Sequence, residues 1–105
     1  MDIEKLTEKA QLAVSTAQEI ALRLGHQQVD GEHLHMALLT QEEGLIPRLV
    51  GLMGVNTELL TKDLENELER LPKVYGSSAS MYATRRFNEI LLNAEDEAKK
   101  FKDEY

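Results

Sequence analysis

Hydrophobic residues recur along most of the chain at the three- and four-residue spacing that is typical of amphipathic helices. The first such stretch follows Thr7, a residue type that caps helix N-termini, and ends at Gly25, which suits the left-handed turn after a helix. We therefore predict a helix between these two residues. Its apolar stripe is Ala10, Ala13, Val14, Ala17, Ala21 and Leu24.

Three more helices are expected before residue 72. Asp30 is placed to cap a helix from about 31 to 40, because its carboxylate can accept hydrogen bonds from unpaired backbone N–H groups. A third helix runs from about 45 to 53, with Pro47 tolerated in its first turn. A fourth is capped by Asn56 or Thr57 and closed by Pro72, with the stripe Leu60, Leu64, Leu68 and Leu71.

The segment 72–82, PKVYGSSASMY, collects glycine and serine and predicts a linker. Thr84 then caps a last helix, whose apolar stripe is Phe87, Ile90, Leu91, Ala94, Ala98 and Phe101. No segment shows the alternation expected of a strand, so the sequence predicts an all-α protein.

The last helix repeats the first at a shift of 77 residues, because the stripe and the capping threonine both move by that distance. We therefore predict a first helical repeat over 1–71, a linker over 72–82, and the start of a second repeat over 83–105 that is truncated after its first helix. Such a truncation would leave apolar side chains of the last helix short of cover, so we expect either a homodimer that forms through this helix or fraying of the helix. These side chains are Phe87, Ile90, Leu91 and Phe101.

Composition narrows the functional classes. Nineteen acidic residues against twelve basic ones give a net charge of −7, which repels phosphate backbones and argues against nucleic acid as a partner. The absence of cysteine excludes disulfides and thiolate metal sites. No apolar run approaches the roughly 18 residues of a membrane span, and the charged N-terminus does not resemble a signal peptide, so a cytoplasmic protein without a membrane partner is expected.

The sequence EHLH, residues 32–35, is the one cluster that suggests chemistry. His33 and His35 are two residues apart, so on a helix they point to nearly opposite sides and cannot hold one metal ion. Glu32 falls in the first turn, where the helix dipole favours negative charge and where a cationic ligand can also bind. The glycines form no phosphate-binding loop and the serines no nucleophile elbow, so we expect no enzyme activity and no cofactor.

The segment LTEKAQLAVSTAQEIALRLGHQQVDGEHLHMALL resembles the opening of the Clp amino-terminal domain, also called the Clp R domain. The later stretches LERLPKV and AEDEAKKFKDEY are most similar to the ClpB disaggregase branch. The chain departs from the family pattern at His35, where an aliphatic residue is usual, and it lacks the second copy of the EHL box.

The resemblance implies the helical repeat bundle of Clp amino-terminal domains. It also implies a substrate-binding domain tethered to a hexameric AAA+ ATPase, which captures exposed apolar segments of unfolded or aggregated polypeptides. Those polypeptides and the parent hexamer are the expected partners, with the ATPase activity located elsewhere in the parent protein.

Candidate substrate-binding residues come first from comparing the two repeats. Leu12 pairs with Glu89, and Leu92 pairs with Ser15, so each leucine is apolar in one copy only and is not required by a common core. We predict both for a binding groove, the alternative being a second core contact or an ordinary surface leucine.

Four further candidates lie near the helix ends. Met81 and Tyr82 precede the last helix and are residue types common at adaptable binding surfaces. Thr7 and Asp103 match polar positions that the resemblance places at the substrate-binding face. For Thr7 the alternative is a helix cap only, and for Asp103 a solvated charge at the helix end.

Two other functions stay open. The ClpC branch uses the glutamate of the EH box to bind phosphoarginine or adaptor proteins, and Glu32 stands at that position, although Asp30 adds negative charge where the phosphate would dock. A structural or oligomerisation helical bundle is the third alternative.

Overall fold

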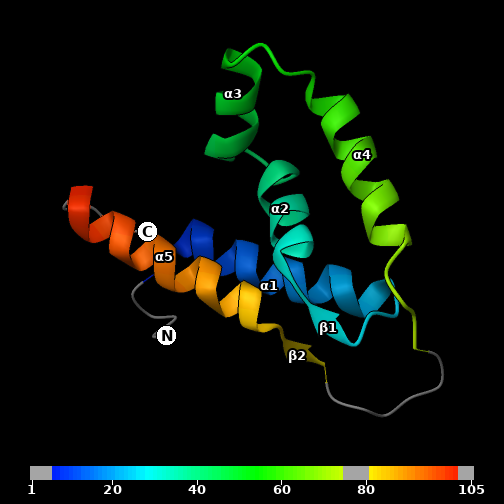
Figure 1. Cartoon of the computed structure of the whole chain (residues 1–105). Coiled ribbons are helices and arrows are strands. Elements are labelled where there is room, and N and C mark those ends of the chain that lie inside the picture. Colours follow the sequence, from blue (N-terminus) through cyan, green and yellow to red (C-terminus); the bar gives the residue numbers. More distant parts are fainter. Residues whose placement is uncertain (1–5, 75–80, 102–105) are drawn as a thin grey trace.

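The computed structural model describes residues 6–74 and 81–101, which form five helices and two very short strands (Figure 1). The predicted all-α class is confirmed. The elements in chain order are α1 (Glu8–Arg23), β1 (Gln28–Val29), α2 (Gly31–Leu39), α3 (Leu45–Leu52), α4 (Thr57–Glu69), β2 (Tyr82–Ala83) and α5 (Arg85–Phe101).

Four helices begin directly after a predicted capping residue, whereas α4 ends at Glu69, before the predicted stripe residue Leu71. Thr7 Oγ1 accepts a hydrogen bond from the backbone N–H of Ala10 at 3.1 Å, and Asn56 caps α4 in the same manner. Thr84 Oγ1 accepts from the N–H of Phe87, also at 3.1 Å, at the start of α5. Gly25 has φ +76°, the left-handed conformation that ends α1.

The expectation that the chain has no strand is wrong. β1 and β2 pair in parallel, held by hydrogen bonds from Tyr82 N–H to the Gln27 carbonyl and from Thr84 N–H to the Val29 carbonyl, each 3.0 Å. Each strand has only two residues, which is too short for an alternating pattern, and tertiary packing brings the two segments together. β2 thus takes Tyr82 from the predicted linker, whose residues 75–80 lie outside the described part.

The first hydrophobic core joins α1, α2 and α5. A row of alanines on α1 (Ala13, Ala17 and Ala21) is buried, and these small side chains allow α2 to pack closely against α1. From α5, Phe87 and Leu91 enter the same core, where Val29 and Leu34 are also buried.

The expectation that the stripe of α5 lacks cover is therefore wrong for two of its members. Phe87 is only 2% exposed and Leu91 is 7% exposed, because they share the first core with residues of α1, β1 and α2. Ile90 remains 37% exposed, and the side chain of Phe101 lies outside the described part.

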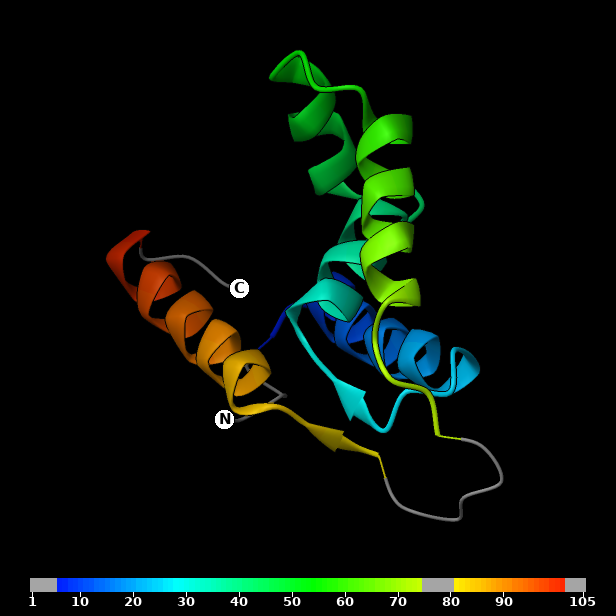
Figure 2. The same cartoon turned by 45° about the vertical axis from the view of Figure 1, so that its right-hand side comes forward.

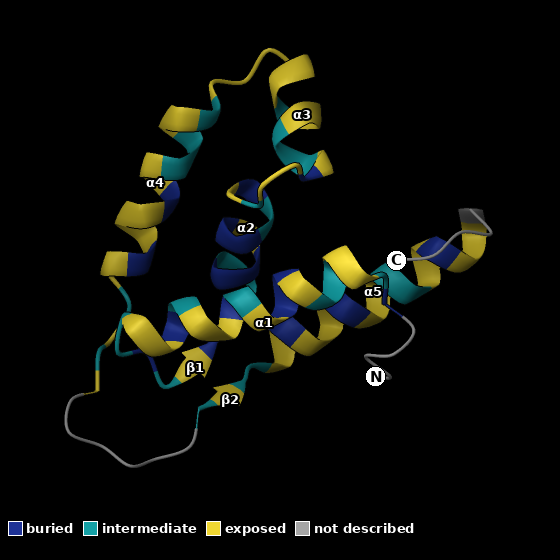
Figure 3. Ribbon diagram, turned by 180° about the vertical axis from the view of Figure 1, so that it is seen from behind, coloured by how far each residue is buried: buried dark blue, intermediate teal, exposed yellow. Residues whose placement is uncertain are grey.

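A second core lies between α2 and α4 and contains Met36, Leu39, Leu64 and Leu68. Helix α3 and the N-terminal end of α4 extend away from α1 and α5, whereas the C-terminal end of α4 returns to the end of α1 (Figures 1 and 2). Helix α3 contains no buried residue, in contrast to the buried positions along α1 and α2 (Figure 3). The chain therefore has a well-packed base of α1, α2 and α5, and a more exposed arm of α3 and α4.

Candidate functional site

A groove of about 450 Å³ lies between α2 and α5. Its floor is apolar and its rim is charged or polar. Leu34, Leu38 and Ile90 supply the apolar side chains, Glu32, His35 and Arg86 supply the polar ones, and Gly31 completes the lining. We call this the α2–α5 groove. An apolar floor with a few polar groups at the edge is the usual composition of a ligand-binding site.

Gly31 allows α5 to approach the start of α2. A Cβ atom at this position would lie 3.0 Å from Ile90 Cδ1 and 3.6 Å from one terminal nitrogen of Arg86. Such a contact is tighter than ordinary van der Waals packing, so an alanine at this position would require the end of the Ile90 side chain to shift by a few tenths of an ångström. Gly31 thus leaves space for Ile90 at the start of α2.

Arg86 joins the two sides of the groove through an ion-pair cluster. Its Nε donates a hydrogen bond to Asp30 Oδ1 at 2.9 Å, and its Nη2 donates to the carboxylate of Glu32. Asp30 also accepts from the backbone N–H of Gly31 at 2.7 Å, which makes it both a helix cap and a partner of Arg86. The cation beside Glu32, expected from the sequence as a ligand, is in this structure a side chain of the same protein.

The cluster shifts the pKa of both partners. Burial alone would raise the pKa of Asp30, but hydrogen bonds from Arg86, Gly31 and Thr84 outweigh it and hold the pKa below its usual value. The hydrogen bonds to Asp30 and Glu32 raise the pKa of Arg86. Both charges are therefore maintained at neutral pH.

Replacing Arg86 with methionine is expected to raise the pKa of Asp30 and to lower the free energy of unfolding by about 1 kcal/mol, because a partly exposed ion-pair network contributes modestly. NMR titration of the Asp30 carboxyl carbon and urea unfolding would measure the two effects. Arg85→Met is the matched control, since Arg85 pairs only locally with Glu89 on the surface of α5. An Asp30 pKa that is equal in both variants would contradict the assigned contact.

The two histidines of the EHLH segment face opposite sides, as their spacing predicted. His35 is exposed at the α2–α5 groove, whereas His33 is completely buried. His33 Nδ1 accepts a hydrogen bond from the backbone N–H of Asp30 at 2.9 Å, and His33 Nε2 lies 2.8 Å from Nδ1 of His26, which follows α1. Among the described residues no three His, Asp or Glu side chains gather to hold a metal ion.

The hydrogen bonds of this pair fix its protonation. Because Asp30 N–H needs an acceptor, the proton of His33 sits on Nε2, where it is donated to His26. The proton of His26 then sits on its Nε2, which is buried without a hydrogen-bond partner in the described part of the chain. A further proton on either ring would break one of these bonds, so both histidines are neutral.

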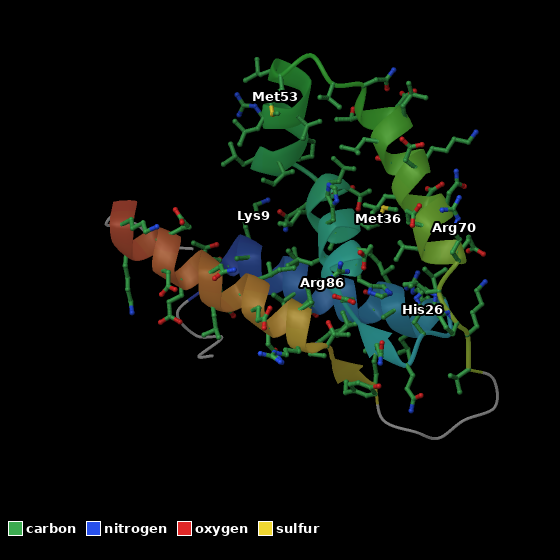
Figure 4. The ribbon with its side chains drawn as sticks, viewed as in Figure 1. Lys9, His26, Met36, Met53, Arg70 and Arg86 are labelled. Atoms are coloured by element: carbon green, nitrogen blue, oxygen red, sulfur yellow. The ribbon has the colours of Figure 1, made fainter. Side chains whose placement is uncertain are left out.

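Burial is the largest cause that lowers the pKa of each histidine. For His33 the neighbouring His26 lowers the pKa further, and for His26 the ammonium of Lys73 does the same. Glu69 and the Leu68 carbonyl act in the opposite direction on His26, which lies near the C-terminal end of α4 (Figure 4). The pair therefore joins α1, α2 and α4 in its uncharged form.

The predicted apolar site residues do not share one cavity. Leu12 is exposed and lines a separate cavity of about 500 Å³ together with Lys9, Thr16 and residues 40–43. Leu92 is exposed on α5 but lines neither this cavity nor the α2–α5 groove.

The other predicted site residues lie at the helix ends. Met81 is partly buried against the first core, and the exposed Tyr82 accepts a hydrogen bond from the Gln28 side-chain amide at 2.5 Å. Thr7 serves as the N-cap of α1, and Asp103 lies outside the described residues. Of the predicted site residues that the structure describes, Glu32 alone lines the α2–α5 groove.

Sequence reasoning missed the groove residues Leu34, Leu38, Ile90 and Arg86. One signal was present in the sequence. Under the predicted shift of 77 residues Ile90 corresponds to Ala13, so the last helix has a large side chain where the first helix has a small one. Arg86 gave no local signal, since its partners lie 54 and 56 residues away in sequence.

The fold and the groove together define a class: a small all-α domain whose surface carries an apolar groove with a charged rim. No described helix is long and apolar enough to cross a membrane. The model of the Clp repeat (R) N-terminal domain matches residues 5–105, so the chain belongs to this family.

Relatives with established names agree with that assignment. The chaperone protein ClpB of Clostridium tetani is 47% identical over 108 residues, and that of Nitratidesulfovibrio vulgaris is 48% identical over the same length. ClpB 2 of a Nostoc strain is 40% identical over 101 residues. The first two alignments cover the whole chain and the third 96% of it, yet in each case the chain spans only 12% of the relative's length.

Proposed function

We propose that this chain is the substrate-binding N-terminal domain of a ClpB-type AAA+ chaperone or disaggregase, and that its α2–α5 groove captures exposed apolar segments of unfolded or aggregated polypeptides. The observation that carries the proposal is the apolar floor of Leu34, Leu38 and Ile90. It lies in a chain that aligns over all of its own residues with ClpB sequences. The ATPase ring of the parent protein is the second partner that we propose.

The groove suits a weak and sequence-tolerant interaction. Its floor offers aliphatic side chains without a closed pocket, so it can accept leucine, valine or an aromatic ring of a client. Glu32, His35 and Arg86 at the rim can hydrogen-bond the backbone of the same segment. Binding of this kind requires no bond-making chemistry, and we propose that this domain is not an enzyme.

Replacing Ile90 with aspartate is expected to weaken binding of an unfolded polypeptide about tenfold, because a carboxylate in the floor must be desolvated by an apolar client. Ile90 is 37% exposed, so the fold is expected to persist. Fluorescence anisotropy with labelled casein would measure the affinity, and far-UV circular dichroism the helicity.

Two further variants sharpen this test. Leu22→Asp is the matched control, because Leu22 is 69% exposed on α1 and lines neither the α2–α5 groove nor the Leu12 cavity. Leu92→Asp tests the residue that the repeat comparison selected, and it too should weaken capture without loss of helicity if the bound segment extends along α5. Equal affinities of the Ile90→Asp and Leu22→Asp variants would refute the groove as the binding site.

A second candidate function is recognition of phosphoarginine, as in the ClpC branch. The Arg86 contact shows that Glu32 can bind a guanidinium in this position, but an external guanidinium would have to displace Arg86, and Asp30 would repel the phosphate. Titration with an arginine-phosphorylated peptide and with an unmodified apolar peptide separates the candidates. Preference for the phosphorylated peptide favours the ClpC-like role, and binding of neither favours a structural bundle.

A further inference from the structure

The chain after α4 returns to the base and packs on the turn that follows α1. We call its residues 70–74 the α4 tail. Val74 N–H donates a hydrogen bond to the Gly25 carbonyl at 2.7 Å. Leu71 of the tail and Leu24 at the end of α1 both pack, partly buried, against the second core. The arm is therefore tied to the base at this turn as well as through the second core.

The buried histidine pair lies at the same junction. His26 belongs to the turn after α1 and is 5% exposed, and its Nδ1 lies 2.8 Å from Nε2 of His33 on α2. Its ring is also close to the end of α4, since the Leu68 carbonyl and the charges of Glu69 and Lys73 act on it. The pair is thus the point where α1, α2 and the end of α4 meet (Figure 4).

A cavity of about 200 Å³ lies beside the pair. Both imidazole rings line it, and Leu71, Pro72 and Val74 of the α4 tail form another part of its lining. A small displacement of the tail therefore brings water to the rings, because it widens a cavity that already exists. No described residue lines both this cavity and the α2–α5 groove.

On the side of α2, a proton added to the pair lacks a carboxylate of its own. Asp30 and Glu32 are the acidic groups that favour a charge on His33, and both already bind Arg86 of α5. In the last turn of α1 the charged residue is Arg23, a cation whose side chain is 77% exposed. A charged imidazole would therefore be buried without a partner here.

The charges on the side of α4 nearly offset each other. Glu69 and Lys73 act on His26 in opposite directions, and they form an ion pair with each other at 3.0 Å. Burial opposes a charge on His26 more strongly than either of them acts. A proton on His26 is therefore stabilised only when the ring reaches water.

We propose that the His26–His33 pair is an acid-sensitive latch that holds the α4 tail and the C-terminal end of α4 on the base. A proton added to either ring breaks one of the hydrogen bonds that hold the pair, and the charged ring is hydrated when the tail moves away. The opening uncovers the second core. The first core contains no residue of α4, so α1 and α5 stay packed while the latch is open. The latch does not rest on the proposed client binding.

Amide hydrogen exchange of the whole chain at pH 7.5, 6.5 and 5.5 tests the latch, after correction for the intrinsic pH dependence of exchange. Protection of the α4 amides should fall as pH is lowered, by up to about tenfold per pH unit for each histidine that titrates. At each pH the α1 amides should remain more protected than those of α4, because α1 opens only when the first core unfolds. Protection of α4 that is independent of pH, or protection that is equal in α1 and α4, would overturn the proposal.

Two variants separate proton uptake from simple loosening of α4. His26→Gln removes one titrating group, so the fall in α4 protection between pH 7.5 and 5.5 should be smaller than in the wild type. Leu64→Ala is the matched control, because Leu64 is buried in the second core and carries no charge. It should lower α4 protection by a similar factor at every pH and leave the fall unchanged. A fall in His26→Gln as large as in Leu64→Ala would show that the pair is not the latch.

Discussion

Replacing Phe87 with alanine is expected to lower the free energy of unfolding by about 3–5 kcal/mol, which is a large part of the stability of a small domain. Phe87 is 2% exposed and belongs to the first core, which also contains buried side chains of α1, β1 and α2. The substitution removes its ring from this core and leaves a cavity under α5. Urea unfolding followed by circular dichroism would measure the change.

Leu92→Ala is the control on the same helix. Leu92 is 48% exposed, so its truncation is expected to cost less than about 1 kcal/mol. If both variants lose similar amounts of stability, Phe87 does not anchor α5 on α1 and α2, and the sequence-based expectation of an uncovered last helix would be restored.

The second large effect is a loss of stability at mildly acidic pH. The folded-state pKa values of His26 and His33 lie below the ordinary value of 6.5, so the unfolded chain binds more protons than the folded chain as pH falls. The stability from this pair is complete above about pH 6.5 and decreases below it, by up to about 1.4 kcal/mol per pH unit for each histidine. Urea unfolding at pH 7.5, 6.5 and 5.5 would measure the slope.

One variant assigns this slope to the buried pair. His26→Gln should be less stable than the wild type at pH 7.5 and should show a smaller slope, because one buried titrating group is gone. A wild-type slope near zero, or an equal slope in His26→Gln, would mean that the pair does not exclude protons.

Local features of this fold were accessible from the sequence because they depend on neighbouring residues. A capping side chain lies within three residues of the N–H groups that it binds, and a helical stripe needs only a few turns to be recognised. Thr7, Asp30 and Thr84 were therefore placed correctly as helix caps, and of the two candidates for α4 the structure uses Asn56.

Contacts that link distant segments could not be predicted from the sequence. The strands β1 and β2 are two residues long and exist only because their segments meet in the fold. Arg86 meets Asp30 and Glu32 across more than fifty residues, and the His26–His33 pair depends on how the chain turns after α1. The α2–α5 groove is built from such contacts, so its floor was missed and only Glu32 was selected.

The most direct test of the central claim is an NMR titration of the ¹⁵N-labelled chain with unlabelled casein. If the α2–α5 groove captures unfolded polypeptide, backbone amide shifts should change progressively over residues 31–38 and 86–90, and the same titration of Ile90→Asp should change them much less. Saturable binding whose shift changes avoid both segments, or the absence of any change at millimolar client concentration, would contradict the proposed function.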